Sequence, residues 1–288
     1  MRLRPQALVL ALLFAACRVP VRAETPPAAL NEPRATPPTD ADSGAPPDAS
    51  ISAEPVPSWS PYQPFEINHI LATGQSLAVG VSGAPPTTLA QPFHNLMFNT
   101  GVMAGGEDLT GFEPLVEGDN IPGSKVKVET MSASFANLAS QLASADRGAH
   151  DILLSNHAAG AKSYWQLKKG TKFYANGMAQ VTAAAAIAKQ LGKTYVVRAV
   201  TTVHGESDHA DKSTRYAQDL LEWQSDYQKD VQVITGQTEP VPMFQTQISS
   251  WTKMMGGTET SAIPMAQLDA HVRSKSRGLG GVFRVGPK

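Results

Sequence analysis

Cysteine is almost missing from this sequence of 288 residues, whose one example is Cys17. The chain after it can therefore form no disulfide and offers no thiol nucleophile. Aromatic residues make up 7% of the chain and there is no long apolar lid segment, which disfavours a lipid or thioester hydrolase. Neither sign of charge dominates, since 24 basic residues stand against 25 acidic ones, so nothing indicates a nucleic-acid partner.

The first residues have the pattern of an export signal. Arg2 and Arg4 give a positive start, and the apolar run from Ala7 to Ala16 is too short to cross a membrane but suits a signal-peptide core. We therefore predict that residues 1–23 form a signal peptide and that the protein is exported to the periplasm, the cell envelope or the medium.

Two processing sites fit this signal. Val21-Arg22-Ala23 has apolar or small residues at the positions that ordinary signal peptidase prefers. Phe14-Ala15-Ala16-Cys17 instead resembles a lipobox, in which Cys17 would carry a lipid anchor. Phenylalanine is atypical at the first lipobox position, so we favour soluble export and keep the lipid anchor as the alternative.

A proline-rich segment follows the signal. Residues 24–64 contain eleven of the 22 prolines and many small polar residues. Such a stretch buries too little apolar surface to offset the entropy lost on ordering. We predict a disordered linker, which either tethers the domain or has no task of its own, and a folded domain over residues 65–288.

From Phe65 onward the sequence alternates between strand and helix patterns. Short β-branched runs predict strands, and apolar residues three or four apart predict helices. Strands are expected at 67–72, 95–98, 151–155, 195–203, 241–248 and 281–285, and helices at 132–145, 174–191, 216–230 and 264–272. This alternation predicts right-handed βαβ units and a parallel sheet, so the fold class is α/β. Sites in such sheets lie beyond the carboxyl ends of the strands.

Polar clusters follow three of these strands. Thr73-Gly74-Gln75-Ser76-Leu77 places a serine on a tight strand-to-helix turn, as a nucleophile or as a helix cap. The segment from Asn156 to Ala161, which includes Gly160, is rich in small residues and leaves room for a ligand. The segment from Val203 to His209 combines two histidines with two acids but lacks a familiar zinc spacing. No metal or organic cofactor is predicted.

Together these segments resemble the sialate O-acetylesterase-like group of SGNH hydrolases, which are carbohydrate esterases. Gly74-Gln75-Ser76 matches the nucleophile block of that group. His204-Gly205-Glu206-Ser207-Asp208, about 130 residues later, matches its Q-G-E-S-D block with histidine in place of glutamine. The resemblance covers roughly residues 65–288. It implies a three-layer α/β/α sandwich with a mainly parallel, flavodoxin-like sheet of about five strands.

The resemblance also implies a mechanism. Ser76 would be the nucleophile of ester hydrolysis, and its own N–H would help to bind the oxyanion. A second N–H would come from a glycine after the second strand, for which Gly101, Gly105 and Gly106 are the candidates. His204 would replace a glutamine side chain that donates near the oxyanion, and the two acids would organise the loop or touch substrate. The residues expected around the oxyanion and the substrate are Gln75, Gly105, Gly160, His204, Glu206 and Asp208.

The base that this mechanism needs is missing from the sequence. The group takes its catalytic histidine from a D-x-x-H segment after the last strand. Asp269 and His271 lie two apart in a predicted helix and point away from each other, while His69 and His150 lie in or before strands. We expect the chain to be a fragment, truncated before that segment, with a natural variant that lost the base as the alternative. Either would have little activity.

The function implied by the resemblance is therefore hydrolysis of O-acetyl or other small acyl esters on carbohydrates, through an acyl-enzyme on Ser76. The preference for acetyl groups and sugars comes from the resemblance alone. The alternative is a non-catalytic carbohydrate-binding protein on the same fold, because the catalytic histidine segment is absent. The oligomeric state is not predicted by the sequence.

Overall fold

A computed structural model describes residues 65–287 of the chain, apart from residue 122 and residues 148–150 and 250–259. Residues Phe65–Lys288 form one compact unit. The predicted signal peptide, the possible lipid anchor and the predicted linker all lie outside the described residues. None of the helices in the described part of the chain is long and apolar enough to span a membrane.

A seven-stranded sheet forms the centre of this unit, in the order β3-β2-β6-β1-β7-β8-β9. All neighbouring strands are parallel except the pair formed by β2 and β3. The strands are β1 (Ile67–Gly74), β2 (Leu96–Phe98), β3 (Phe112–Pro114), β6 (Asp151–Asn156), β7 (Tyr195–Val203), β8 (Met243–Gln247) and β9 (Val282–Pro287). The α/β class and the mainly parallel sheet are thus confirmed, with seven strands rather than about five.

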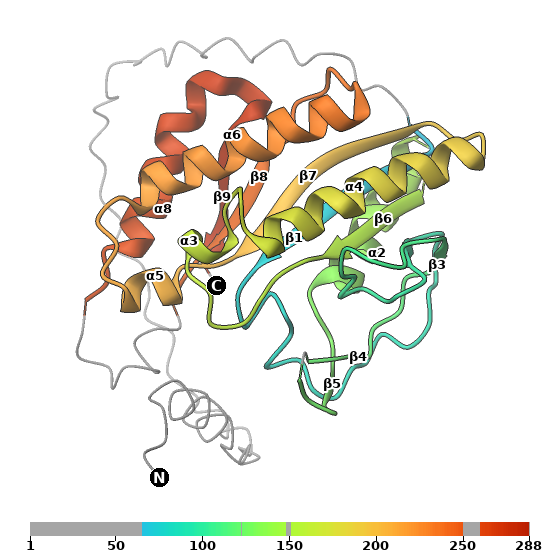
Figure 1. Ribbon diagram of the computed structural model, residues 1–288, viewed down its shortest axis with the longest axis horizontal. Coiled ribbons are helices and arrows are strands. Elements are labelled where there is room, and N and C mark those ends of the chain that lie inside the picture. Colours follow the sequence, from blue (N-terminus) through green and yellow to red (C-terminus); the bar gives the residue numbers. More distant parts are fainter. Residues whose placement is uncertain (1–64, 122, 148–150, 250–259, 288) are drawn as a thin grey trace, which may run out of the picture. The chain divides into compact units, whose positions relative to one another are not determined.

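Helices cover both faces of the sheet, which gives the expected three layers (Figure 1). One face carries α4 (Lys172–Gln190), α6 (Tyr216–Thr235) and α8 (Ile263–Ser274), and the other carries α2 (Ser132–Arg147). Strand β1 shows the division, because successive side chains of a strand point to opposite faces. Leu71 packs in the cluster with α4 and α6, whereas its neighbour Ile70 packs against α2.

Shorter elements connect these layers. Helices α3 and α5 lie in the connections that follow β6 and β7, and a separate two-stranded sheet lies between β3 and α2. Their bounds are α3 (Tyr164–Leu167), α5 (Glu206–Ala210), η1 (Lys275–Gly280), β4 (Asp119–Asn120) and β5 (Lys127–Val128).

Strand β7 and helix α4 show why these residues adopt these elements. The run over β7 is the most β-branched in the chain, and it is buried against β1 on one side and β8 on the other. Helix α4 is rich in alanine, the best helix former. Its first turn is capped by Thr171, whose hydroxyl accepts a hydrogen bond from Tyr174 N at 3.4 Å, and Gly192 follows its end with a φ of 66°.

Candidate active site

Ser76 lies on a tight turn at the carboxyl end of β1, the central strand of the sheet. Gly74 has a φ of 128°, and a Cβ atom there would overlap the carbonyl oxygen of Val203 on β7. Only glycine lets the chain approach β7 so closely. Gln75 N then donates to that same carbonyl at 3.1 Å, which directs the chain into the turn. Ser76 is half-buried in this turn, at the sheet edge where α/β sites form.

The segment after β6 supports the turn from the other side. Ala159 N donates to Gly74 O at 3.0 Å, so the pairing of β6 with β1 continues past the strand. Asn156 donates through Nδ2 to Ala78 O at 2.7 Å and accepts from Ala158 N at 2.9 Å. The side chain of Asn156 is buried, so these bonds form away from water and fix the second polar cluster against the first.

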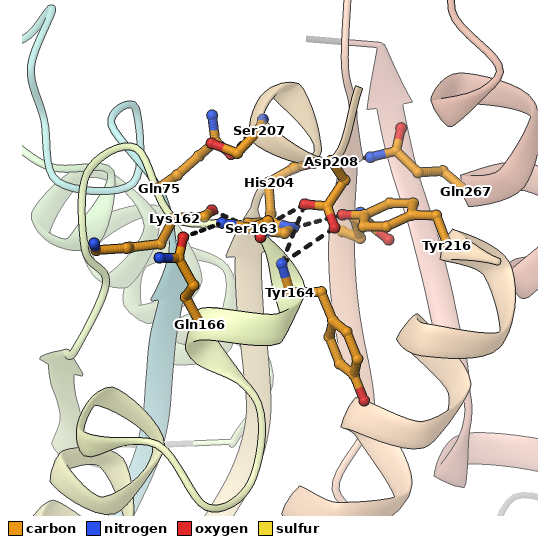
Figure 2. Close-up of polar contacts among 11 residues, drawn as sticks. Gln75, Lys162, Ser163, Tyr164, Gln166, His204, Ser207, Asp208, Tyr216 and Gln267 are labelled. Carbon is orange, nitrogen blue, oxygen red and sulfur yellow. Dashed lines mark hydrogen bonds and ion pairs between the residues drawn. The ribbon is translucent and has the colours of Figure 1, made fainter. Parts of the chain in front are cut away.

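The third cluster joins the first through Gln75. Its side-chain oxygen Oε1 accepts a hydrogen bond of 3.1 Å from Ser207 N, 132 residues later in the chain. Gly205, with a φ of 134°, forms the corner between β7 and α5, and a Cβ there would meet the Ile263 side chain at 2.8 Å. The structure therefore brings the turn of Ser76 together with the block from His204 to Asp208. Figure 2 shows Gln75 of this turn beside Ser207, with His204 and Asp208 near them.

His204 is fully buried, and protein groups contact both of its ring nitrogens (Figure 2). Nε2 lies 3.1 Å from Lys162 O, and Nδ1 lies 2.6 Å from the Tyr216 hydroxyl. Burial lowers the pKa of His204 to about 4, so the ring is neutral at pH 7. Because a carbonyl can only accept, Nε2 carries the proton and Nδ1 accepts from Tyr216.

This geometry leaves His204 no hydrogen-bonding atom for a substrate. The sequence had suggested that it donates near the oxyanion, as glutamine does in the resembling group. In the structure its ring instead links the segment after β6 to α6. Its backbone carbonyl is also engaged, since it accepts from Gln267 Nε2 at 3.0 Å.

Asp208 is buried next to His204 and holds the same segment. Its two carboxylate oxygens accept from Tyr164 N at 3.1 and 3.2 Å, and Oδ2 lies 3.3 Å from His204 Nε2. Burial raises the pKa of Asp208 to about 7. With these contacts, Asp208 organises the loop that contains Tyr164, and both of its carboxylate oxygens are engaged by protein groups. Glu206 is half-buried in the first turn of α5.

The three candidate glycines after β2 differ in their surroundings. The N–H of Gly101 donates to Phe98 O at 2.9 Å, and a Cβ there would overlap the Asp119 carboxylate, so Gly101 closes a turn. The carbonyl of Gly105 accepts from Gln180 Nε2 at 3.2 Å. Because N–H and C=O point in opposite directions in a trans peptide, the N–H of Gly106 points away from that glutamine. The segment lies close to the turn of Ser76, since Met103 packs against the cluster that contains Ala78.

None of the described histidines forms a hydrogen bond with the Ser76 hydroxyl. His271 Nδ1 lies 3.3 Å from Val282 O, and Asp269 instead pairs with Arg273 at 2.6 Å. His69 contacts Tyr195 and Ser155 inside the sheet, while His150 lies outside the described residues. Within the described part of the chain, no hydrogen-bond partner contacts the Ser76 hydroxyl, and no cluster of side chains there could hold a metal ion.

Two buried glutamines of the site were not identified from the sequence. Gln267 of α8 bonds His204 O and also accepts from Ile248 N at 2.9 Å, so it ties the end of β8 to the third cluster. Gln180 of α4 holds the glycine segment and accepts from Ser155 Oγ at 2.8 Å. Each stands among apolar residues on the buried face of its helix. A glutamine at a position where the helical pattern expects an apolar core residue could have identified each of them.

Comparison with known proteins shows similarity at the level of the fold. No family model matches the chain, and no curated protein matches it. A solved structure of a protein from Arabidopsis thaliana is similar with a TM-score of 0.51 and 19% identity, over 77% of this chain and 86% of that one. A carbohydrate acetylesterase from Xanthomonas citri matches at a TM-score of 0.42 and 13% identity, over 76% of this chain and 49% of that one. An aryl esterase from M. smegmatis gives 0.36 and 13%, over 75% and 83%. The first of these shows a shared fold.

Proposed function

We propose that this chain is a serine hydrolase of the SGNH type, close to the sialate O-acetylesterase-like group. Its substrates are O-acetyl or other small acyl esters, carried on carbohydrates. One observation supports this above the others: Ser76 stands on a tight turn at the end of the central strand, and Gln75 joins that turn to the block from His204 to Asp208. The described residues that follow Ser76 form turns rather than a helix, so Ser76 does not serve as a helix cap.

The chemistry follows from the exposed edge of this turn. The Ser76 oxygen attacks the ester carbonyl, and the carbonyl oxygen becomes an oxyanion. The serine proton passes to a histidine base that the resemblance places after the last strand and that lies outside the described residues. Among the described residues, no protein group accepts from the N–H of Ser76, so this N–H is available to the oxyanion. The N–H groups of Gly105 and Gly106 are the candidates for a second donor. The alcohol then leaves with a proton, and water hydrolyses the acyl-enzyme and restores Ser76.

His204 and Asp208 have positioning roles in this proposal. Both are buried, and their hydrogen bonds go to Lys162, Tyr164 and Tyr216 rather than toward the exposed edge. They hold the segment after β6 and the start of α5 at a fixed distance from Gln75. Gly160 is exposed in that segment with open space around its α-carbon, which suits a place where substrate passes.

A second candidate function is carbohydrate binding without catalysis. It is favoured by one observation, that no base contacts the Ser76 hydroxyl in the described part of the chain. In a serine hydrolase, loss of the catalytic histidine lowers turnover on the order of 10⁶-fold. A protein with that defect would retain the turn and its N–H donors, and so would keep the surface at which a sugar ester binds in this proposal.

The two functions separate in one experiment. Acetate release from acetylated xylo-oligosaccharides and from 4-nitrophenyl acetate is measured for the full gene product, for its Ser76→Ala variant and for the control Ser276→Ala, which lies exposed on η1. Turnover that is lost in Ser76→Ala and kept in the control supports the hydrolase. Sugar binding by calorimetry that survives Ser76→Ala, without acetate release from any form, supports the binding protein.

Export is part of the same proposal. The positive start and the short apolar run of residues 1–23 support a signal peptide, with Cys17 as the alternative site of a lipid anchor. Mass spectrometry of the protein recovered from its producing cell distinguishes a chain that begins after Ala23 from one that begins with lipidated Cys17.

A further inference from the structure

Four polar side chains form a continuous line of hydrogen bonds between the sheet and α4. The Tyr195 hydroxyl lies 2.7 Å from His69 Nδ1, and His69 Nε2 lies 2.8 Å from Ser155 Oγ. Ser155 Oγ in turn lies 2.8 Å from Gln180 Oε1. His69, Ser155 and Gln180 are fully buried, so these bonds form away from water. Polar groups are costly to bury, and this buried network of four side chains therefore needs an explanation.

The proton positions in the buried network follow from its last member. Gln180 Nε2 donates to two backbone carbonyls of the segment after β2, and a carbonyl can only accept. Gln180 Oε1 therefore faces Ser155 and accepts the serine proton, so Ser155 Oγ accepts from His69 Nε2. Burial lowers the pKa of His69 to about 3, so at pH 7 the ring is neutral and its Nδ1 accepts from Tyr195. The amide of Gln180 can thus take only one orientation.

The two carbonyls that Gln180 binds belong to successive peptide groups, those of Ala104 and Gly105. In a trans peptide the N–H points opposite to the C=O, so the N–H groups of Gly105 and Gly106 both point away from Gln180. Among the described residues, no protein group accepts from either N–H. Gly105 is exposed, with open space around its α-carbon. Successive free N–H groups of this kind are suited to bind an anion.

This segment is anchored beside the turn of Ser76. Asn156 N donates to Val102 O at 2.9 Å, and the side chain of Asn156 bonds Ala78 O within that turn. Met103 packs against the cluster that contains Ala78. The two free N–H groups follow Met103 closely along the chain, so they lie near the place where the proposed hydrolysis needs a second donor for the oxyanion.

We propose that Gln180 is a positioning residue for the oxyanion site. This inference rests on the proposed function and deepens it, since it assigns the second donor to the peptide groups of Gly105 and Gly106. Gln180 holds their carbonyl side from within the protein, and the buried network fixes the orientation of its amide. The N–H groups therefore keep their direction while negative charge develops on the ester oxygen, and donors that are oriented in advance stabilise that charge without reorganisation.

The first test compares the turnover of 4-nitrophenyl acetate by the full gene product and by its variants Gln180→Met and Gln224→Met. Gln224 is the matched control, because it is also a buried helix glutamine, and its Nε2 donates to Val241 O at 3.1 Å. Val241 precedes β8, at the sheet edge opposite to Ser76. Both variants should fold, which circular dichroism checks, and urea unfolding should show that both lose stability.

We expect the two variants to differ in kcat. Gln180→Met should lower kcat on the order of 10²-fold, as loss of an oxyanion donor does, and should change KM by less than about 2-fold. Gln224→Met should leave both constants within about 2-fold of wild type, since it acts on stability alone. Equal kcat values for Gln180→Met and Gln224→Met would overturn the proposal.

A second measurement requires no turnover and no variant. Sodium acetate, the reaction product, is titrated into the isotope-labelled chain, and the amide NMR signals of Gly105 and Gly106 are followed. Both should shift in the wild type, and the shifts should be lost in Gln180→Met but kept in Gln224→Met. If no form of the gene product releases acetate, the proposed function fails and this titration decides on Gln180 by itself. Wild-type signals that acetate does not move would then overturn the positioning role.

Discussion

The substitution His204→Gln tests the account of the buried histidine most directly. The neutral ring donates from Nε2 to Lys162 O and accepts at Nδ1 from Tyr216. A glutamine side chain also has one donor group and one acceptor group, so it can replace both bonds. At pH 7 we therefore expect the free energy of unfolding to change by no more than about 1 kcal/mol, the net worth of one hydrogen bond.

The pH dependence should differ between the two proteins. Burial lowers the pKa of His204 from 6.5 to about 4. Between these values the unfolded chain binds a proton that the folded chain does not, so the stability contributed by the neutral histidine is present above pH 6.5 and is lost as the pH falls toward 4. Linkage gives a loss of about 2 kcal/mol between pH 7 and pH 5. Glutamine does not titrate, so His204→Gln should gain that amount relative to wild type.

Asp208 works in the opposite direction and is present in both proteins. Its pKa is raised to about 7 by burial, so its protonation on acidification favours the folded state. To a first approximation this contribution cancels when the two proteins are compared at each pH. The difference between them therefore reports His204.

Urea unfolding followed by tryptophan fluorescence at pH 7 and pH 5 provides the measurement. Trp223 is fully buried and packs edge-on against His204, with ring centroids 5.3 Å apart, so its emission should report loss of this packing. His94→Gln, at an exposed histidine, is the control for the loss of a histidine as such. Its free energy of unfolding should differ from that of wild type by the same amount at pH 7 and at pH 5. An equal pH dependence for wild type and His204→Gln would refute the buried neutral state.

Three further substitutions test the geometry around Ser76, each by urea unfolding. Gly74→Ala should lower the free energy of unfolding by at least about 2 kcal/mol more than Gly170→Ala, because both have positive φ but only Gly74 abuts a backbone carbonyl. Asn156→Ala should cost about 1–3 kcal/mol, since it leaves Ala78 O without its buried partner. Gln180→Leu should cost a similar amount, because it leaves two loop carbonyls unpaired and leaves the Ser155 hydroxyl with His69 as its remaining partner. Loss of less than about 0.5 kcal/mol in any of these would contradict the contact concerned.

The fold could be predicted because its longer strands are runs of β-branched and apolar residues. The run over Tyr195–Val203 is bounded by changes in composition at both ends, and the structure gives β7 the same limits. Strand β3 could not be found in this way. It has three residues, ends in proline and pairs antiparallel at the edge of the sheet, so no periodic pattern marks it.

The site was only partly predictable, because its residues act through distant partners. Clustering at strand ends identified the segments around Ser76 and His204, and the parallel sheet explains why they meet. The task of His204 could not be inferred, since it depends on Lys162 and Tyr216, which no local pattern connects to it. Helix α2 shows a similar limit. Periodicity predicted the helix, but its small residues face the sheet while Phe135 is exposed.

The turn of Ser76 is a product of the whole sheet rather than of its own sequence. Its hydrogen bonds go to Val203 at the end of β7 and to Ala159 after β6, and the Gln75 side chain bonds the start of α5. These partners join only when three parallel strands have paired, and such non-local contacts form late because long loops must close first. The same bonds hold the turn in place without any base. The turn is therefore organised independently of any base, and a proton acceptor placed beside Ser76 would require no change in it.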